Sequence, residues 1–452
     1  MFHSNDTICA PATPAGTGAI AVVRISGPDT QRVVLAFLAD APLPSPGRLE
    51  RRFLTAPTSG MLLDEAMVVC FVAPATYTGE DTAELHLHGS PLLVEEVLNE
   101  LSRLGVRHAQ PGEFTLRAFL NGKKDLTQAE AVQDLVQASS PGALTLALGQ
   151  LTGSVSRALT PLEEQFLKLV ALLEAEIDFP EDVPEMSKED LRKRLIAMQL
   201  EIDGVLAHYE QARLLRSGFR VVLVGAPNAG KSSLFNSLLK NNRAIVTDEA
   251  GTTRDFLEEH LAQRPVPVVL VDTAGFRTAV SQAEKVGVER SQDQLDGAHL
   301  VVLVVDPTTP WSADDARIEE ATRRPGRLVV STHVDVADAS GALSQPLSVD
   351  HRVSCINAGG VDELRTALLT AAKVALGNDA THATIVSRRQ QQAVLVARDV
   401  VLRAQEDLWD LPVDVLASSL REGLEALYEV TGKGMVAEDV LEEIFSNFCI
   451  GK

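Results

Sequence analysis

The sequence is poor in cysteine and in aromatic residues. Its four cysteines, Cys9, Cys70, Cys355 and Cys449, form no CxxC pair, so neither a zinc knuckle nor a disulfide framework is predicted. We expect the first three to be small buried apolar residues. Cys449 lies near the C-terminus and could be either a nucleophile or a packing residue.

Long hydrophobic runs are also missing. No apolar stretch approaches the length of a membrane-spanning helix, and no basic region followed by an apolar segment stands at the N-terminus. The interpretation is a cytoplasmic protein with no membrane partner. The chain has 452 residues, of which 45% are hydrophobic, which is typical of about two to four packed domains and argues against disorder.

Positive charge is scarce as well, because the net charge is −21. A protein that holds nucleic acid by itself usually has a basic face, since phosphate contacts supply most of the affinity. Any nucleic-acid role would therefore need local basic patches, of which Lys123-Lys124 and Arg388-Arg389 are candidates, or help from a second protein.

What the chain does contain is a phosphate-binding loop, Gly225-Ala226-Pro227-Asn228-Ala229-Gly230-Lys231-Ser232. An apolar, β-branched run precedes it and a helical pattern follows. Backbone N–H groups would close around a β-phosphate at the helix N-terminus. Lys231 would lie along the β- and γ-phosphates, and the Ser232 hydroxyl would bind Mg²⁺. The alternative, a glycine turn before an ordinary helix, is disfavoured by this context.

Hydrophobic periodicity predicts a multidomain α/β and α+β protein. Residues 1–121 mix short strands and helices, residues 122–217 carry helical stripes, residues 218–376 carry continuous apolar strands, and residues 377–452 return to helix. The prediction is an α+β domain, followed by an α/β nucleotide domain with a mostly parallel sheet, inserted into a helical domain whose halves flank it. Strands are expected over 19–27, 67–72, 83–89, 220–224, 266–271, 300–305 and 328–331, a Pro-rich loop over 41–57, and helices over 92–104, 144–159, 162–177, 191–214, 387–408, 413–431 and 437–445.

Further segments follow in the order that a guanine-nucleotide switch protein needs. In Gly251-Thr252-Thr253, Thr253 is placed to bind Mg²⁺ while a γ-phosphate is present. In Asp272-Thr273-Ala274-Gly275, Asp272 would hold the metal through water and the Gly275 N–H would sense the γ-phosphate. Each short match is weak alone, but their order after a phosphate loop makes them strong.

Recognition of the base is expected from Thr332-His333-Val334-Asp335, where guanine-nucleotide proteins have Asn-Lys-x-Asp. The Asp335 carboxylate can accept both guanine N1–H and the exocyclic amine, an arrangement that adenine cannot satisfy. The usual Asn and Lys are absent, and Val353-Ser354-Cys355-Ile356 replaces the usual Ser-Ala-Lys. Guanine preference should survive, whereas affinity is in doubt. The expected GTP contacts are Asn228, Ala229, Gly230, Lys231, Ser232, Ser233, Thr247, Asp248, Glu249, Ala250, Gly251, Thr252, Thr253, Asp272, Thr273, Ala274, Gly275, Asp335, Ser354 and Cys355.

The water-orienting Gln of many such proteins is missing, because Phe276 follows Gly275. An apolar residue cannot orient the attacking water, so charge neutralisation must come from elsewhere. Asn228 is a candidate ligand for a monovalent cation beside the β/γ bridge. The alternative is that Asn228 only stabilises a turn.

Together these motifs resemble the MnmE (TrmE) family of tRNA-modification GTPases. The resemblance extends over the chain through Asp6-Thr7-Ile8, Arg24-Ile25-Ser26-Gly27, Tyr77-Thr78-Gly79-Glu80-Asp81, Pro111-Gly112-Glu113-Phe114, Arg117-Ala118-Phe119-Leu120-Asn121-Gly122-Lys123 and the tail Phe445-Ser446-Asn447-Phe448-Cys449-Ile450-Gly451-Lys452. It implies an N-terminal folate-binding and dimerisation domain and a Ras-like P-loop G domain.

The resemblance also implies a site for 5-formyl- or 5,10-methylene-tetrahydrofolate at Arg24, Glu84, Lys123 and Lys452. This assignment is chemically reasonable, because a folate brings carboxylates for the cations and a pterin amide edge for a carboxylate. Which folate is used stays open. Without the family, a surface ion pair between Arg24 and Glu84 would be the default interpretation.

The resemblance implies a homodimeric protein whose G domains dimerise in a potassium-dependent way. It also implies that Glu284 is an acid that organises the attacking water. Potassium would be held by Asn228, Thr247, Glu249 and Thr252, and the catalytic set would be Glu284, Lys231 and Cys449.

The implied partner is a flavoprotein, MnmG (GidA), in a heterotetramer or larger complex that uses FAD and NADH. The pair would add an aminomethyl or carboxymethylaminomethyl group to C5 of the wobble uridine of certain tRNAs. Two alternatives stay open. One is a regulatory GTPase of ribosome assembly, which usually brings a basic RNA-binding appendage that is not visible here. The other is a folate enzyme with an inactive G domain, which leaves the switch threonines and Asp272 unexplained.

Overall fold

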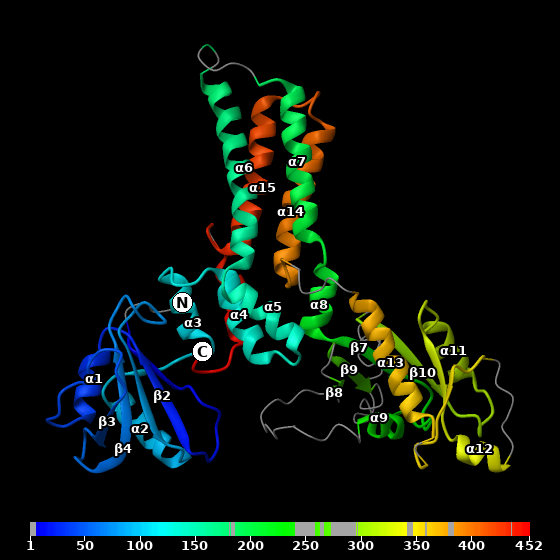
Figure 1. Ribbon diagram of the computed structural model, residues 1–452, viewed down its shortest axis with the longest axis horizontal. Coiled ribbons are helices and arrows are strands. Elements are labelled where there is room, and N and C mark those ends of the chain that lie inside the picture. Colours follow the sequence, from blue (N-terminus) through cyan, green and yellow to red (C-terminus); the bar gives the residue numbers. More distant parts are fainter. Residues whose placement is uncertain are drawn as a thin grey trace. The chain divides into compact units, whose positions relative to one another are not determined.

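The computed structural model describes residues 6–179, 181, 186–239, 258–262, 266–272, 295, 297–340, 347–357, 359–377, 384–434 and 436–452 (Figure 1). The chain divides into two compact units. The first contains Met1–Val136, Ala147–Val205 and Arg388–Lys452, and the second contains Gln137–Leu146 and Leu206–Ser387. The C-terminal helices therefore fold with the N-terminal part of the chain, and the nucleotide segment is inserted between them.

The first unit begins with a six-stranded sheet in the order β3-β4-β5-β2-β1-β6, antiparallel except for the β1–β6 pair. Apolar and polar residues alternate along its strands, so the apolar side chains lie on one face of the sheet, in a core, and the polar side chains lie on the opposite face. In β5, Ala83, Leu85 and Leu87 are buried in the core, whereas Glu84 and His86 are half-buried. The strands are β1 (Ile8–Pro11), β2 (Ile20–Ser26), β3 (Glu50–Thr55), β4 (Leu62–Phe71), β5 (Thr82–His88) and β6 (Arg107–His108).

Helices α1 (Thr30–Phe37) and α2 (Pro91–Arg103) cover one face of this sheet. Val33, Phe37, Val97 and Leu101 pack with the strand residues in one buried cluster. A smaller cluster joins the first strand to Phe114 of α3 (Glu113–Leu120). The sheet thus has an apolar face under two helices, and its polar residues at Arg24 and Glu84 stand apart from that core.

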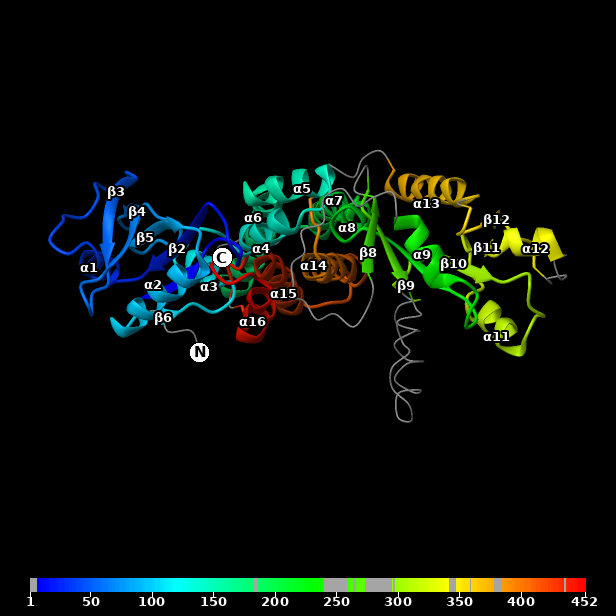
Figure 2. The same cartoon turned by 90° about the horizontal axis from the view of Figure 1, so that it is seen from below.

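Four long helices of the first unit lie side by side (Figures 1 and 2). They come from both ends of the unit: α6 (Ser154–Asp178), α7 (Lys188–Leu206), α14 (Arg388–Glu406) and α15 (Val413–Thr431). Helix α15 packs against both α6 and α14. At Gly423 a Cβ atom would lie 2.6 Å from the Phe166 ring and 3.2 Å from Val400, so the helices approach closely there. The remaining helices are α4 (Leu126–Gln137), α5 (Pro141–Leu151) and α16 (Glu438–Ser446).

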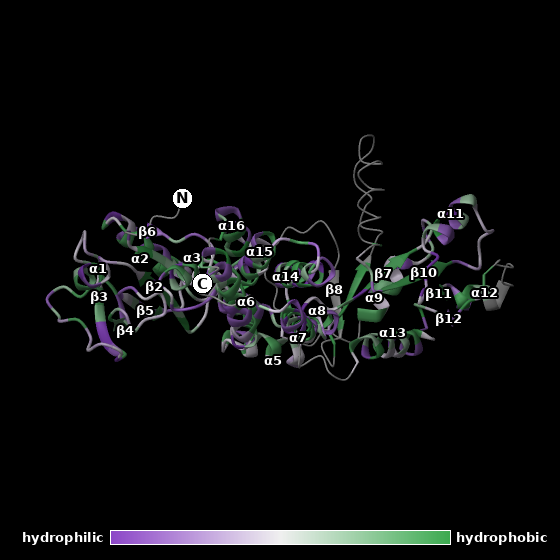
Figure 3. Ribbon diagram, turned by 90° about the horizontal axis from the view of Figure 1, so that it is seen from above, coloured by the Kyte–Doolittle hydropathy of each residue, from purple (hydrophilic) through white to green (hydrophobic). Residues whose placement is uncertain are grey.

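The second unit has a six-stranded sheet in the order β12-β11-β10-β7-β9-β8, parallel except for the β8–β9 pair. Its central strands are buried on both faces and read as continuous apolar runs, which Figure 3 shows in green for β10. One face packs on α9 and α13 and the other packs on α11 (Figure 2). The elements are α8 (Tyr209–Ser217), β7 (Phe219–Val224), α9 (Lys231–Leu239), β8 (Glu258–Ala262), β9 (Val268–Asp272), β10 (Leu300–Val305), α11 (Ala313–Ala321), β11 (Leu328–Ser331), α12 (Val334–Ser340), β12 (His351–Arg352) and α13 (Val361–Leu376).

The predicted fold class is confirmed, but three local predictions are wrong. The Pro-rich stretch 41–57 contains β3, which lies at the edge of the sheet, pairs with β4 and exposes Arg51 and Phe53. The helical stripes of residues 144–177 divide at Gly153, which has a left-handed φ of +81°, and not near Pro161, which lies inside α6. Residues 191–214 likewise divide at His208, with a φ of +65°. In the part of the chain that the structure describes, no helix is long and apolar enough to cross a membrane.

Candidate nucleotide and cofactor sites

The first candidate site lies at the carboxyl edge of the second unit's parallel sheet. The phosphate loop follows β7, Asp306 follows β10, Thr332 to Asp335 follow β11, and Ser354 follows β12. The strand order reverses between β7 and β10, because the chain goes from β7 to β9 on one side and from β10 to β11 on the other. Ligands of open α/β sheets bind at such a switch point. The sequence-predicted segments therefore meet at one edge.

The phosphate loop is pressed against the neighbouring strand. A Cβ atom at Gly225 would lie 2.2 Å from the Val304 carbonyl oxygen, so only glycine fits there. Gly230 has a φ of +87° and Asn228 a φ of +67°, which turn the backbone before α9 begins at Lys231. Asn228 thus lies in a left-handed turn of the loop, and both of its predicted roles stay predictions.

The Lys231 ammonium group is folded back onto its own loop. Its Nζ donates to the carbonyl oxygens of Gly225 and Ala226, both at 2.8 Å. The side chain is buried, and the same ammonium can serve a phosphate oxygen that enters the loop. Ala229, Gly230, Ser232 and Ser233 follow in the same loop and the first turn of α9, as the motif requires.

The base-recognition segment joins the end of β11 to α12. Asp335 stands in the first turn of α12 and is half-buried. His333 has a φ of +51°, and its Nδ1 lies 3.1 Å from Oδ2 of Asp306. The hydroxyl of Thr332 is buried and donates to the Ala229 carbonyl oxygen at 2.7 Å. The segment is therefore attached directly to the phosphate loop.

The second base loop is a tight turn between β12 and α13. The buried Ser354 hydroxyl accepts a hydrogen bond from the Asn357 N–H at 3.2 Å. The Ser354 backbone N–H donates to the Gly359 carbonyl oxygen at 2.9 Å. A Cβ atom at Gly360 would lie 2.0 Å from the Arg352 carbonyl oxygen, so the backbone passes close to Arg352 there. Cys355 is half-buried, unlike Cys9 and Cys70, so the prediction that the first three cysteines are buried is wrong for Cys355.

Part of the predicted nucleotide site lies outside the described residues. Asp272 ends β9 beside Leu223 of β7, and its side chain is outside the description. Within the described ranges, no group of three or more His, Cys, Asp or Glu residues could hold a metal ion. The sequence-predicted residues that lie outside the described ranges are Thr247, Asp248, Glu249, Ala250, Gly251, Thr252, Thr253, Thr273, Ala274, Gly275 and Glu284.

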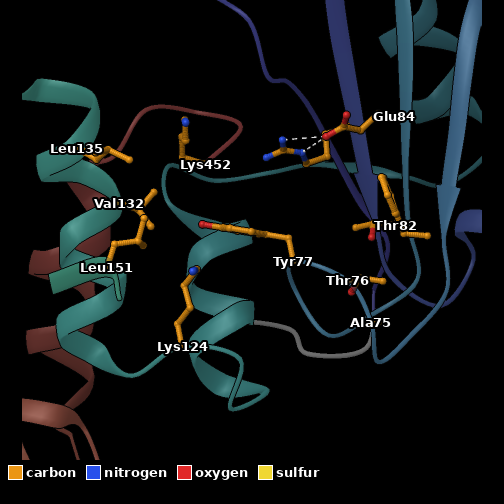
Figure 4. A pocket seen from close by; sticks show the side chains of 12 residues that line it. Ala75, Thr76, Tyr77, Thr82, Glu84, Lys124, Val132, Leu135, Leu151 and Lys452 are labelled. Carbon is orange, nitrogen blue, oxygen red and sulfur yellow. Dashed lines mark hydrogen bonds and ion pairs between the residues drawn. The ribbon is translucent and has the colours of Figure 1, made fainter. Parts of the chain in front are cut away.

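The second candidate site is a cavity of about 460 Å³ in the first unit (Figure 4). One side is the polar part of the N-terminal sheet, with Arg24, Thr82 and Glu84. The opposite side is apolar, with Val132 and Leu135 of α4 and Leu151 of α5. A site with one polar and one apolar wall suits a flat heteroaromatic ligand with hydrogen-bonding edges.

The polar wall is organised around an ion pair between neighbouring strands. Arg24 and Glu84 are directly opposite in the β2–β5 register. Nε and Nη2 of Arg24 donate to the same Glu84 oxygen, at 3.0 and 2.9 Å, and His86 Nε2 lies 3.1 Å from the other oxygen. Burial acts to raise the pKa of Glu84, but Arg24 and His86 outweigh it and hold the pKa below its usual range. Glu84 is therefore an ionised acceptor that faces the cavity.

Tyr77 and Lys124 extend into the space between the walls (Figure 4). The Tyr77 hydroxyl lies 2.9 Å from the Thr115 hydroxyl of α3, and burial raises its pKa. The Lys124 ammonium lies 5.4 Å from the centre of the Tyr77 ring, and burial lowers its pKa. Lys123, by contrast, does not line the cavity, and its Nζ donates to the Pro74 carbonyl oxygen at 2.9 Å.

The C-terminal tail completes the cavity. Lys452 lines it, and Arg24 Nη1 donates to the Gly451 carbonyl oxygen at 3.1 Å. Gly451 has a φ of +92°, and a Cβ atom there would lie 2.1 Å from the Pro11 carbonyl oxygen. Phe445 and Phe448 anchor the tail in an apolar cluster with Leu116 and Leu126. Cys449 is exposed on this anchored tail.

Sequence reasoning identified Arg24, Glu84 and Lys452 but missed Thr82. The Thr82 hydroxyl is buried and has no hydrogen-bond partner among the described residues. A buried hydroxyl without a partner costs about 1–3 kcal/mol, so its place in a cavity wall points to a ligand. The signal was available in the strand period, because Thr82 and Glu84 are two residues apart and share one face. The carboxylate, the cations, the apolar wall and this hydroxyl all line one cavity.

The two sites together define a class of protein: a P-loop nucleotide-binding protein that carries a second ligand site on a separate unit. Two family models match the chain, the GTP-binding protein TrmE N-terminus over residues 7–123 and the MnmE helical domain over residues 126–449.

Curated relatives named tRNA modification GTPase MnmE match nearly the whole chain. One from Synechococcus sp. (strain JA-2-3B'a(2-13)) is 41% identical and covers 99% of this chain and 98% of its own. One from Aquifex aeolicus (strain VF5) is 39% identical and covers 99% and 100%. One from Synechococcus sp. (strain ATCC 27144) is 38% identical and covers 99% of each. The chain belongs to the MnmE (TrmE) family and is by class a GTP hydrolase.

Proposed function

We propose that the chain is a potassium-stimulated GTPase that modifies tRNA together with an FAD-dependent partner. The reaction would add an aminomethyl or carboxymethylaminomethyl group to C5 of the wobble uridine, position 34, with a one-carbon unit from tetrahydrofolate. The observation that carries this proposal is the cavity between Glu84 and α4, which the tail closes. The cavity belongs to a different unit from the phosphate loop, so the nucleotide and the proposed cofactor would bind at separate places.

The proposal divides the chain by role. Residues 1–121 would bind folate and form the homodimer, residues 122–217 and 377–452 would form the helical domain, and residues 218–376 would form the G domain. A bound tetrahydrofolate would supply the one-carbon unit. Its proposed contacts are Arg24, Glu84 and Lys452, to which we add Lys124, Tyr77 and Thr82. Lys123, which the resemblance implied, is replaced in this set by Lys124 because its Nζ donates to the Pro74 carbonyl oxygen away from the cavity.

Each wall of the cavity would recognise a different part of the cofactor. The Glu84 carboxylate can accept hydrogen bonds from the N–H edge of a pterin, and Arg24 keeps that carboxylate ionised. The Thr82 hydroxyl supplies a neutral donor or acceptor beside it. Lys124 and Lys452 can pair with the carboxylates of the glutamate end, and Leu135 and Leu151 exclude water. The ligand would thereby be oriented from polar to apolar wall.

For nucleotide hydrolysis, we propose that the Lys231 ammonium exchanges its two loop carbonyls for phosphate oxygens when GTP enters. Ser232 and Thr253 would hold Mg²⁺, and Asn228, Thr247, Glu249 and Thr252 would hold K⁺. Glu284 would organise the attacking water, and it would thereby replace the missing Gln at the position of Phe276. Cys449 is proposed as a catalytic group of the other reaction because it is exposed and stands three residues before Lys452, which lines the cavity.

The cavity favours this proposal over a regulatory role in ribosome assembly, which would not require a cofactor site. A strain that lacks the gene should lose the wobble-uridine modification, and the restored gene should return it. Mass spectrometry of digested tRNA measures the modified nucleoside. Unchanged tRNA in the deletion strain would end the proposal.

Potassium dependence is tested on the purified chain. GTP hydrolysis should be at least several-fold faster in KCl than in NaCl at equal ionic strength, because a cation of the right radius is needed beside the β/γ bridge. Asn228→Ala should remove the difference between the two salts. Equal rates in both salts would contradict the cation site and leave the GTPase class untouched.

A further inference from the structure

The chain departs from other guanine-nucleotide proteins at Thr332, and the structure gives this residue a specific contact. Thr332 is 1% exposed. Its hydroxyl lies 2.7 Å from the Ala229 carbonyl oxygen in the phosphate loop and 3.2 Å from the Val305 carbonyl oxygen at the end of β10. Its own N–H donates to the same Val305 oxygen at 3.0 Å. One residue of the base segment therefore connects to two elements of the phosphate side.

The contact is also steric. Gly230 has a φ of +87°, and a Cβ atom there would lie 3.2 to 3.4 Å from three atoms of the Thr332 side chain. On the other side, Gly225 is pressed against Val304. The phosphate loop is thus held between the ends of β10 and β11, and Thr332 forms the part of this support that belongs to the base segment.

In the proposed site, the base and the phosphates would contact opposite ends of this connection. Asp335 stands three residues after Thr332 in the first turn of α12, and Lys231 stands two residues after Ala229 at the start of α9. The intervening segments are short and turn sharply, since His333 and Gly230 both have positive φ. A shift of either loop must therefore pass through the Thr332–Ala229 hydrogen bond or break it.

We propose that Thr332 is a positioning residue that couples recognition of guanine by Asp335 to the geometry of the phosphate loop. The hydroxyl holds both loops in the ligand-ready arrangement before the nucleotide binds, so less ordering remains to be done on binding. Thr332 stands at the position where other guanine-nucleotide proteins have the Asn of Asn-Lys-x-Asp. The inference rests on the proposed guanine-nucleotide site.

The test compares Thr332→Val, which keeps the shape and removes the hydroxyl, with Thr332→Ser, which keeps the hydroxyl. The matched control is Thr322→Val in the same unit. Thr322 is also 1% exposed, and its hydroxyl also bonds to two backbone carbonyl oxygens, of Ile318 and Glu319. Both Val variants lose the same kind of buried hydrogen bond, but only one of them is in contact with the phosphate loop.

The measurements are the Kd values for fluorescent GDP and for inosine diphosphate, with Mg²⁺ present, and the urea midpoint of each variant. Thr332→Val should raise the Kd for GDP roughly tenfold, the loss expected for one buried hydrogen bond. It should also lower the ratio of the inosine to the guanosine Kd, because Asp335 no longer holds its register against the exocyclic amine. Thr332→Ser should stay within about twofold of the unmodified chain. Thr322→Val should lower the urea midpoint and leave both Kd values unchanged.

A Thr332→Val variant that binds GDP and discriminates inosine diphosphate as the unmodified chain does would overturn the inference, whatever its stability. If this variant does not fold, Thr332→Ala, which adds no methyl group toward Ala229, is measured in its place. Failure of the unmodified chain itself to bind GDP would instead refute the nucleotide site on which the inference rests. The two failures are therefore distinguishable.

Discussion

At the scale of single residues, the cavity depends on one carboxylate whose charge is maintained by its neighbours. The Glu84 side chain is about one-fifth exposed, and without its neighbours this partial burial would raise its pKa. Arg24 reverses that effect through two hydrogen bonds to one oxygen. Glu65 and Arg51 form a pair in the same sheet but are much more exposed. Exposed ion pairs contribute little to stability, so the exposed Glu65 is a suitable control for the half-buried Glu84.

Glu84→Gln should weaken binding of 5-formyl-tetrahydrofolate by roughly tenfold or more, because Arg24 loses its counter-charge and the ligand loses an ionised acceptor. Titration calorimetry measures the Kd. Glu65→Gln should leave it unchanged. Equal affinity of the Glu84→Gln variant would show that the ligand does not contact this wall.

A second residue-scale prediction concerns pH. Glu113 is 2% exposed and receives hydrogen bonds from Arg107 at 2.6 and 3.0 Å and from Arg117 at 3.0 Å. Burial acts to raise its pKa, and the two arginines together with the Gln110 N–H lower it below its usual range. Since the folded pKa lies below the unfolded value, the stabilisation is present above that value and is lost as the pH falls through the folded pKa, below about pH 4.

Glu113→Gln should therefore lose roughly 3 kcal/mol of unfolding free energy at neutral pH, because it leaves buried arginine charge under-compensated. Its unfolding free energy should also depend less on pH below about pH 4. Urea unfolding at several pH values measures both effects. Glu164→Gln, from an exposed pair with Lys168, should change the free energy by less than about 0.5 kcal/mol. Parallel pH curves for the Glu113→Gln variant and the unmodified chain would contradict the assignment.

At the scale of elements, the tail acts as a wall of the cavity. It follows α16 and is held by the Phe445–Phe448 cluster, by the Gln133 side chain on Asn447 at 2.9 Å, and by Arg24 on Gly451. Only glycine fits at 451, since φ is positive and the Pro11 carbonyl leaves no room for a Cβ atom. The tail therefore has one docked position, which the fold fixes.

Gly451→Ala should undock the last residues. Carboxypeptidase should then remove Lys452 faster, and 5-formyl-tetrahydrofolate should bind several-fold more weakly. Gly105→Ala is the control, because Gly105 has a similar φ of +87° but no atom within 4 Å of the added Cβ. Both variants pay about 1 kcal/mol of backbone strain, so only the tail contact separates them. Unchanged digestion and binding in Gly451→Ala would rule out the wall.

At the scale of the whole molecule, the charge limits how the chain meets tRNA. The net charge is −21, and one residue of the expected basic patch Arg388-Arg389 is already engaged, whereas Arg388 is exposed. Arg389 donates to Glu130 at 2.8 Å and to the carbonyl oxygens of Glu429 and Val430. It joins α14 to α4 and α15, so its guanidinium is committed to the packing of the first unit. On the proposed function, the partner would therefore supply most of the phosphate contacts.

The chain alone should bind tRNA with a Kd weaker than about 1 μM at physiological salt, in the range of non-specific binding. Addition of the purified FAD-dependent partner should tighten binding at least tenfold. Filter binding or fluorescence anisotropy measures both. Submicromolar tRNA binding by the chain alone would contradict the prediction that the partner supplies most phosphate contacts. A binding curve measured in 50 mM salt is the positive control.

Local pattern was enough for much of the fold and of the nucleotide site. A strand, glycine turn and helix at residues 220–239 are encoded by neighbours in sequence, and so are the long helices 388–406 and 413–431. The edge strand β3 was missed because its pairing with β4, rather than its own composition, makes it a strand. The break at Gly153 was missed because a single left-handed residue leaves the apolar stripe intact on both sides.

The sequence by itself determined the phosphate loop, the order of the guanine-nucleotide motifs and the family, because each is written in residues that are close together along the chain. Only the tertiary structure decided what surrounds the cavity. It brought the tail carbonyl of Gly451 to Arg24 and placed Lys124 rather than Lys123 in the wall. Among the residues that the structure describes, it left the Thr82 hydroxyl without a hydrogen-bond partner. It also joined Thr332 to Ala229. Such contacts connect residues far apart in sequence, and their geometry depends on how the sheets and helices pack, which no local period encodes.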